Sequence, residues 1–278
     1  MSINAFTENL QRDAAASGLF DGLFLGGSHG RGSADFWSDI DLVGLAPAGR
    51  HEAITDWWRN WLEQGEPLLY FKVLPRGGTL INAIDQRWLR IDLNLVEAAQ
   101  IRGRAKDQLV PLVDPAGLYA GLAESLPDHR ADPRRIEELV WEFIRVLGLT
   151  AVGLGRKEWV VMVMGTGLLR DMLSQIMQEA LPLPDRGGML HLSKILPEGE
   201  MQVLLDLPYP GPEKEALISA QLAIAQAFFP RARRLAAAVG AEWPTRFETA
   251  TRDMLARTIG REPDTLWPRA EHEMNASV

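Results

Sequence analysis

Three aspartates and a glycine-serine pair are the residues of this chain whose types and spacing could do chemistry. Gly27-Ser28 follows a short apolar run, and Asp39 and Asp41 come ten residues later. In an extended strand alternate side chains share a face, so Asp39 and Asp41 point the same way, with Cα atoms about 7 Å apart. Carboxylates at that separation can converge on one hard cation. A glycine-rich turn can direct backbone N–H groups at phosphate. This stretch therefore predicts an anion-binding turn beside a divalent-metal site.

A third aspartate lies on a later predicted strand. Between residues 89 and 96 apolar and polar side chains alternate, with Arg90, Asp92 and Asn94 on the polar face. Asp92 is thus presented outward, 51 residues after Asp41. Phosphoryl and nucleotidyl transfer mainly requires alignment and charge neutralisation, which two cations about 4 Å apart can supply. Three carboxylates on neighbouring strand ends would be enough to hold such cations.

The elements that must position these residues follow from periodicity and turn signals. Strands are predicted at 21–25, 40–45, 67–74, 79–84 and 87–96, with strand-like residues at 109–114. Helices are predicted at 4–17 and 51–64, and 67–74 reads as a buried strand because it is continuously apolar. The first part of the chain should therefore be a mixed sheet of about five strands with helices on one face.

The second part of the chain reads as all helix. The composition shifts to Pro, Asp and His between residues 126 and 132, and Asp132-Pro133 is a typical helix start. Helical periodicity then recurs up to Thr245–Ile259, which Gly260 should end. We predict an α+β protein with a sheet domain over residues 1–130 and a helical-bundle domain over residues 131–278.

Composition limits the classes of partner. Of 278 residues 46% are hydrophobic and 24% charged, as in ordinary globular proteins. The net charge of −8 argues against nucleic acid as a partner, because that affinity comes from Lys and Arg at phosphates, and it favours a cationic or neutral one. No cysteine is present, so a reducing cytoplasm is the expected compartment. No apolar run approaches the roughly 18 residues of a membrane span, so no membrane association is expected.

Together, Gly27-Ser28, Asp39-x-Asp41 and the strand-borne Asp92 resemble the signature of the nucleotidyltransferase superfamily related to DNA polymerase β. The Lys of a Walker loop and the third glycine of a Rossmann fingerprint are both missing from this glycine-rich stretch. A catalytic domain followed by a helical domain is similar to bacterial nucleotidyltransferases that modify small molecules, such as the aminoglycoside and lincosamide resistance enzymes.

The resemblance implies a role for each matched residue. The catalytic and metal-binding residues would be Asp39, Asp41 and Asp92, around two Mg²⁺ ions, with Asp92 on the nucleophile side and able to accept the hydroxyl proton. The nucleotide-binding residues would be Gly27, Ser28 and Arg31, which contact the phosphates of ATP or another nucleoside triphosphate. For Arg31 a solvated surface position is an equal alternative.

The leading hypothesis is transfer of a nucleoside monophosphate, AMP from ATP, to a hydroxyl of a small molecule such as an aminoglycoside-like antibiotic. The helical domain would then form a wall of the acceptor site, and the resemblance leaves a homodimer open. Two alternatives stay open: nucleotidylation of a protein or a tRNA, and a catalytically silent antitoxin or binding module with the same fold. A silent module would not require all three acids.

Overall fold

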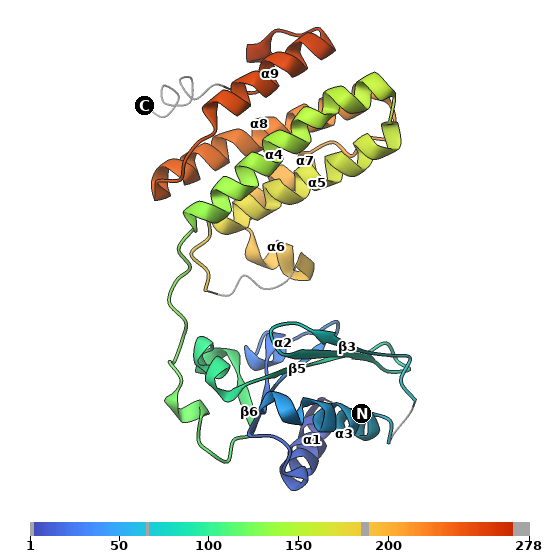
Figure 1. Cartoon of the computed structure of the whole chain (residues 1–278), viewed down its shortest axis with the longest axis vertical. Coiled ribbons are helices and arrows are strands. Elements are labelled where there is room, and N and C mark those ends of the chain that lie inside the picture. Colours follow the sequence, from blue (N-terminus) through green and yellow to red (C-terminus); the bar gives the residue numbers. More distant parts are fainter. Residues whose placement is uncertain (1–2, 65–66, 185–188, 269–278) are drawn as a thin grey trace. The chain divides into compact units, whose positions relative to one another are not determined.

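The computed structural model describes residues 3–64, 67–184 and 189–268. The chain forms two compact units, Met1–Pro127 and Asp128–Val278. The N-terminal unit is built on a sheet and the C-terminal unit on helices, as the colours of Figure 1 show, so the predicted α+β class is confirmed. The predicted domain boundary, between residues 130 and 131, lies three residues beyond the division between the two units.

The N-terminal unit contains a mixed sheet of six strands in the order β3-β4-β5-β2-β1-β6. The strands are β1 Gly22–Leu25, β2 Ile40–Leu45, β3 Tyr70–Pro75, β4 Thr79–Ile84, β5 Arg90–Val96 and β6 Val110–Val113. Only β2 and β5 pair in parallel, and the other neighbours are antiparallel. The sixth strand is the strand-like stretch after residue 109, which adds to the edge beside β1 and was not counted in the predicted sheet of five.

Helices cover one face of this sheet. Helix α1 spans Ile3–Ser17 and α3 spans His51–Leu62, and both turn an apolar stripe inward. Their buried residues pack against alternate residues of the strands, in a core that includes Phe6, Leu10, Ile54, Trp58 and Leu42. The opposite face carries a smaller apolar cluster with Phe24, Val43 and Ile101, the last from the 3₁₀ segment η2, Ala98–Gly103. Polar residues on that second face can therefore remain accessible.

One predicted strand has a different environment from the one expected. The apolar run 67–74 predicted a buried strand, but β3 begins at Tyr70 and pairs only with β4, at the outer edge of the sheet. Tyr70, Lys72 and Val73 are exposed there. An edge strand has one free side, so an apolar sequence alone does not show that it is buried.

The C-terminal unit consists of helices α4 Pro133–Arg156, α5 Trp159–Glu179, α6 Leu192–Ile195, α7 Glu198–Asp206, α8 Lys214–Val239 and α9 Thr245–Ile259. Asp132 accepts a hydrogen bond from the Arg134 N–H at 3.0 Å and caps α4, as its Asp-Pro start predicts. The core of the unit contains Phe143 stacked on Phe228 with ring centroids 3.7 Å apart.

Helix α5 is also long and apolar enough to cross a membrane, judged only by length and composition. Within the most apolar stretch of α5, 44% is buried inside the structure. Because a core helix of a folded domain meets the same criteria, the apolar character of α5 is weak support for a membrane span.

Candidate active site

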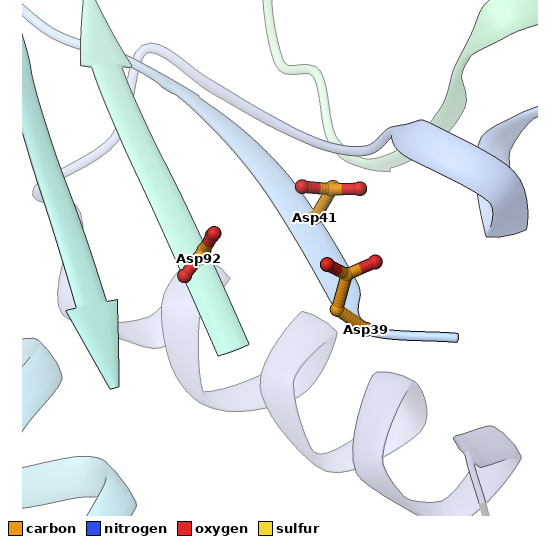
Figure 2. Close-up of side chains that lie close together, drawn as sticks. All are labelled: Asp39, Asp41 and Asp92. Carbon is orange, nitrogen blue, oxygen red and sulfur yellow. The ribbon is translucent and has the colours of Figure 1, made fainter. Parts of the chain in front are cut away.

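The structure brings the three predicted aspartates together on adjacent strands. Asp41 of β2 is the parallel register partner of Asp92 of β5, and Asp39 precedes Asp41 by two residues. Carboxylate oxygens of the three side chains lie within 4.8 Å of one another. Figure 2 shows Asp41 on β2, Asp39 just before the start of that strand, and Asp92 on the neighbouring strand β5. We call these three residues the acid triad.

Strand alternation places the acid triad on the face of the sheet that α1 and α3 leave uncovered. Ile40 and Leu42 point into the helix-covered core, so Asp39 and Asp41 must point to the opposite side. On β5 the buried residues Ile91 and Leu93 fix Asp92 in the same way. Parallel in-register strands are about 4.8 Å apart, so the side chains of register partners meet.

The acid triad is electrostatically unfavourable without a bound cation. Burial, together with the charges of Asp39 and Asp92, raises the pKa of Asp41 to about 6 although Arg31 and Arg90 oppose the shift. Burial also raises the pKa of Asp92, to which Asp39 adds. Such shifts mean that the folded protein holds carboxylates where their charge is poorly solvated. Carboxylate pKa values raised in this way are concentrated at functional sites.

Glycine is required at the turn beside the acid triad. Gly27 begins the short helix α2, Gly27–Gly30, with φ of +55°, and a Cβ atom at this position would lie 1.9 Å from Oδ2 of Asp41. The preceding Gly26 N–H donates to the Asp41 carbonyl oxygen at 2.8 Å. A Cβ atom on Gly30 would lie 2.2 Å from the Gln108 carbonyl oxygen. The backbone of the turn therefore packs directly against Asp41, and no larger residue fits.

Ser28 and Arg31 are the other two residues of this stretch that the sequence predicts as nucleotide-binding. Ser28 is buried, and its Oγ has no hydrogen-bond partner among the described residues. A buried hydroxyl without a partner costs about 1 to 3 kcal/mol, a penalty that a ligand's hydrogen bond would remove. Arg31 is exposed, and its charge lowers the pKa of Asp41, so it lies within electrostatic range of the acid triad.

Sequence reasoning missed two further residues of this face. Arg90 stood on the predicted polar face without a role, and its Nη2 lies 3.4 Å from Oδ2 of Asp39. Asn82 of β4 was not considered, and its side chain hydrogen-bonds to Asp92. The signal for Asn82 was a polar residue of low strand propensity between the buried residues Ile81 and Ala83.

Two indole rings lie close in the chain to the acid triad and are largely exposed. Trp37, two residues before Asp39, is 80% exposed, and Trp88, two residues before Arg90, is 71% exposed. Their turns are fixed, because the Trp37 N–H donates to Oδ1 of Asp35 at 3.0 Å and the Trp88 N–H donates to the carbonyl oxygen of Asp85 at 3.0 Å. Such rings can stack on a planar or sugar ring.

The donor set of the acid triad fits a hard divalent cation. Three carboxylates offer only oxygen ligands, which Mg²⁺ prefers, and their oxygens are close enough to share an ion. Arg90 pairs with one member of the acid triad, Asp39, at the long distance of 3.4 Å. A bound cation would therefore relieve the repulsion that raises the pKa of Asp41.

Comparison with known proteins finds similarity among solved structures. No family model and no curated protein sequence matches the chain. Among solved structures, an aminoglycoside 6-adenyltransferase from Bacillus subtilis is similar, with 13% identity and a TM-score of 0.43, over 90% of this chain and 96% of that one. A TM-score of 0.43 is too low to carry a function, which has to come from the site itself.

Proposed function

We propose that this protein is a Mg²⁺-dependent nucleotidyltransferase that transfers AMP from ATP to a hydroxyl group of a small, cationic acceptor of the aminoglycoside kind. The observation that supports it best is the meeting of three carboxylates, within 4.8 Å of one another, beside a turn whose glycine packs against one of them. A purely structural sheet face would not hold three acids of one sign together.

In this proposal the acid triad would hold the metal, and the glycine turn would bind the triphosphate. Bound Mg²⁺ would neutralise charge on the phosphates and on the departing pyrophosphate. Gly27 and Ser28 would donate hydrogen bonds to phosphate oxygens, and Arg31 would add a cation from solvent. Asp92 would accept the proton of the acceptor hydroxyl while that oxygen bonds to the α-phosphorus and the bond to pyrophosphate breaks.

The test is a pyrophosphate-release assay on the full chain with Mg²⁺, ATP and a panel of aminoglycosides. We expect release that depends on both Mg²⁺ and an acceptor, together with an acceptor whose mass has grown by one AMP residue. Asp41→Asn should abolish release, whereas Asp56→Asn, an exposed acid on α3, should leave it unchanged.

The outcomes separate the proposal from its alternatives. Release with another nucleotide or another hydroxyl acceptor would correct the substrates and keep the chemistry. Metal-dependent nucleotide binding without release for any donor or acceptor, including protein and tRNA acceptors, would instead support a silent binding module. Absence of metal and nucleotide binding in calorimetry would overturn the proposal altogether.

A further inference from the structure

The row of polar residues that contains Asp41 and Asp92 continues onto two more strands of the sheet. Asp92 of β5 is the register partner of Asn82 on β4, and Asn82 is the register partner of Lys72 on β3. Register partners in a sheet point to the same face. Asp41, Asp92, Asn82 and Lys72 therefore form one lateral row across four strands.

Asn82 occupies a strand position where its residue type is locally unfavourable. Its neighbours Ile81 and Ala83 are buried in the core on the other face. Asparagine is depleted in strands, and a β-branched or aliphatic residue would suit this half-buried position better. Departures from local preference are concentrated at functional sites, where a gain in another interaction offsets their cost.

The contact that Asn82 makes supplies such a gain. Its side chain lies beside the Asp92 carboxylate, because the two residues are register partners on one face, and a hydrogen bond between them stabilises the ionised acid. An ionised carboxylate has about four acceptor positions on two oxygens, so one amide leaves several for a cation. A hydrogen bond from the side also fixes the rotation of the carboxylate. Second-shell partners orient metal ligands in this way.

We propose that Asn82 is a positioning residue that holds Asp92 in the orientation in which it binds a divalent cation. This inference rests on the proposed metal site. It adds to that site Asn82, which is not one of the residues that resemble the nucleotidyltransferase signature. Asn82 acts through Asp92 and does not need to touch the cation.

The test measures binding of Mn²⁺ alone to the full chain, by the loss of the free-ion electron paramagnetic resonance signal. Asn82→Leu has nearly the same shape, lacks the donor and suits a strand. We expect it to weaken Mn²⁺ binding about 10- to 100-fold. Asn94→Leu is the matched control, because Asn94 lies on the same face but has Val43 and Leu80 as register partners. Its Mn²⁺ affinity should stay close to that of the unaltered protein.

A double-mutant cycle removes the effect of a damaged fold. In an Asp92→Asn background, Asn82→Leu should cause no further loss, whereas a general loss of structure would lower affinity in both backgrounds. Equal Mn²⁺ affinities of Asn82→Leu and Asn94→Leu would overturn the role of Asn82 while leaving the proposed function intact. If Mn²⁺ binding depends on Asn82 but no nucleotide is transferred, the proposed function fails alone. If the unaltered protein binds no Mn²⁺, both fail.

Discussion

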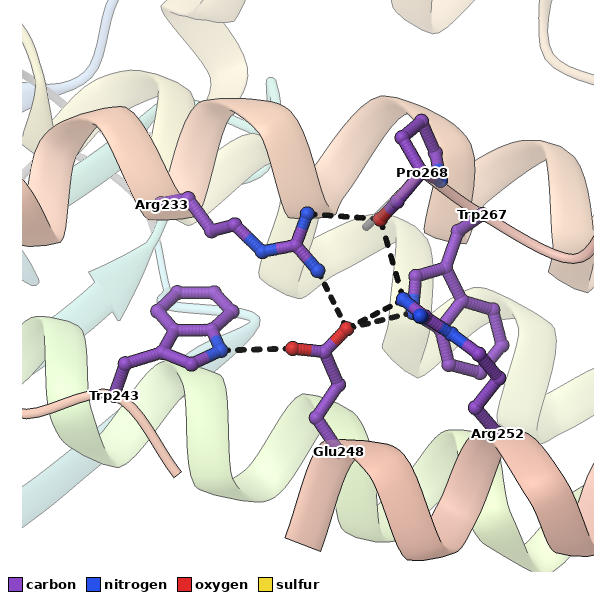
Figure 3. A network of polar contacts seen from close by, with 6 residues as sticks. All are labelled: Arg233, Trp243, Glu248, Arg252, Trp267 and Pro268. Atoms are coloured by element: carbon purple, nitrogen blue, oxygen red, sulfur yellow. Dashed lines mark hydrogen bonds and ion pairs between the residues drawn. The ribbon is translucent and has the colours of Figure 1, made fainter. Parts of the chain in front are cut away.

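Two groups of charged side chains in this molecule contain poorly solvated carboxylates, and they differ in how the charge of those carboxylates is balanced. In the helical unit a single acid, Glu248 of α9, is surrounded by donors from α8, from α9 itself and from the segments at Trp243 and Trp267 (Figure 3). Arg252 Nη2 donates to its Oε1 at 2.7 Å, and Arg233 of α8 donates to the same oxygen. The indole N–H of Trp243 donates to Oε2 of Glu248 at 2.8 Å, and the indole N–H of Trp267 donates to Oε1 at 2.9 Å.

The acid triad is the reverse case. Three carboxylates share one face, and Arg90 lies at the long distance of 3.4 Å from one of them, Asp39. Glu248 and its two arginines are at most 10% exposed and are paired with one another, whereas each acid of the triad is partly accessible and lies beside two other acids. The comparison shows that the Glu248 network balances its charge from within, whereas in the proposed function a bound cation would balance the charge of the acid triad.

Removal of the central acid of the Glu248 network should give the largest change in stability. Glu248→Gln would leave two buried arginines facing a neutral amide, and loss of one partner of a buried ion pair costs about 3 to 5 kcal/mol. Urea denaturation followed by circular dichroism, which weights the helical unit, measures the loss.

The matched control is Glu142→Gln, which breaks an exposed pair between Glu142 and Arg145 at 2.6 Å. Exposed pairs contribute about 0 to 1 kcal/mol, so this variant should unfold almost like the unaltered protein. Equal losses for the two substitutions would show that the Glu248 network is no more important for stability than a surface pair.

Addition of a cation should stabilise the sheet unit and not the helical unit. At a Mg²⁺ concentration 100 times the dissociation constant, binding raises the free energy of unfolding by about 2.7 kcal/mol. Thermal unfolding with Mg²⁺ and with EDTA measures this effect, which Asp41→Asn should abolish and Asp56→Asn should retain. Unfolding curves that coincide with and without Mg²⁺ would contradict an incomplete network at the acid triad.

Without metal, neutralising one acid of the triad should stabilise the protein, the opposite sign to Glu248→Gln. The pKa of Asp41 is about 6 in the folded state, against 3.8 unfolded, so the folded state binds more protons and stability falls as pH rises between these values. A shift of about two units would be worth about 3 kcal/mol, and partial exposure reduces it to about 1 to 2 kcal/mol.

Urea denaturation in EDTA at pH 8 and pH 3.5 tests this sign. Asp41→Asn should be more stable than the unaltered protein at pH 8, and most of this difference should disappear at pH 3.5, where Asp41 is mostly protonated in both states. If Asp41→Asn is the less stable protein at pH 8, the acid triad is not strained by its own charge.

The orientation of the acid triad could be predicted from the sequence because the alternation of side chains along a strand is a local property. The spacing of Asp39 and Asp41, and the alternation around Asp92, place all three on one face before any pairing is known. Helix ends are equally local: Thr245–Ile259 ends where Gly260 adopts φ of +68°, as its glycine predicts. Such features depend on neighbours within a few residues.

Features that depend on pairing between distant segments were not predictable in this way. A two-residue turn was expected after β4, but the connection runs to Leu89 through Trp88 at φ of +65°, and this register sets Asn82 opposite Asp92. The Glu248 network joins segments from residue 233 to 268, with no periodicity to mark them. The contact that makes Gly27 obligatory is likewise made across strands.

The smallest predicted effect is a pH dependence of cation binding at the acid triad, which the Glu248 network should not influence. Mg²⁺ must displace the proton of Asp41, whose pKa is about 6. Lowering the pH from 7.5 to 5 should therefore weaken Mg²⁺ binding about tenfold, or about 1.4 kcal/mol. Isothermal titration calorimetry at pH 6, in two buffers of different ionisation enthalpy, should detect proton release on binding, and at pH 8 it should detect none. An affinity that does not change between pH 5 and 7.5 would mean that the cation binds without Asp41, and the acid triad would then lose its most strained member as a ligand.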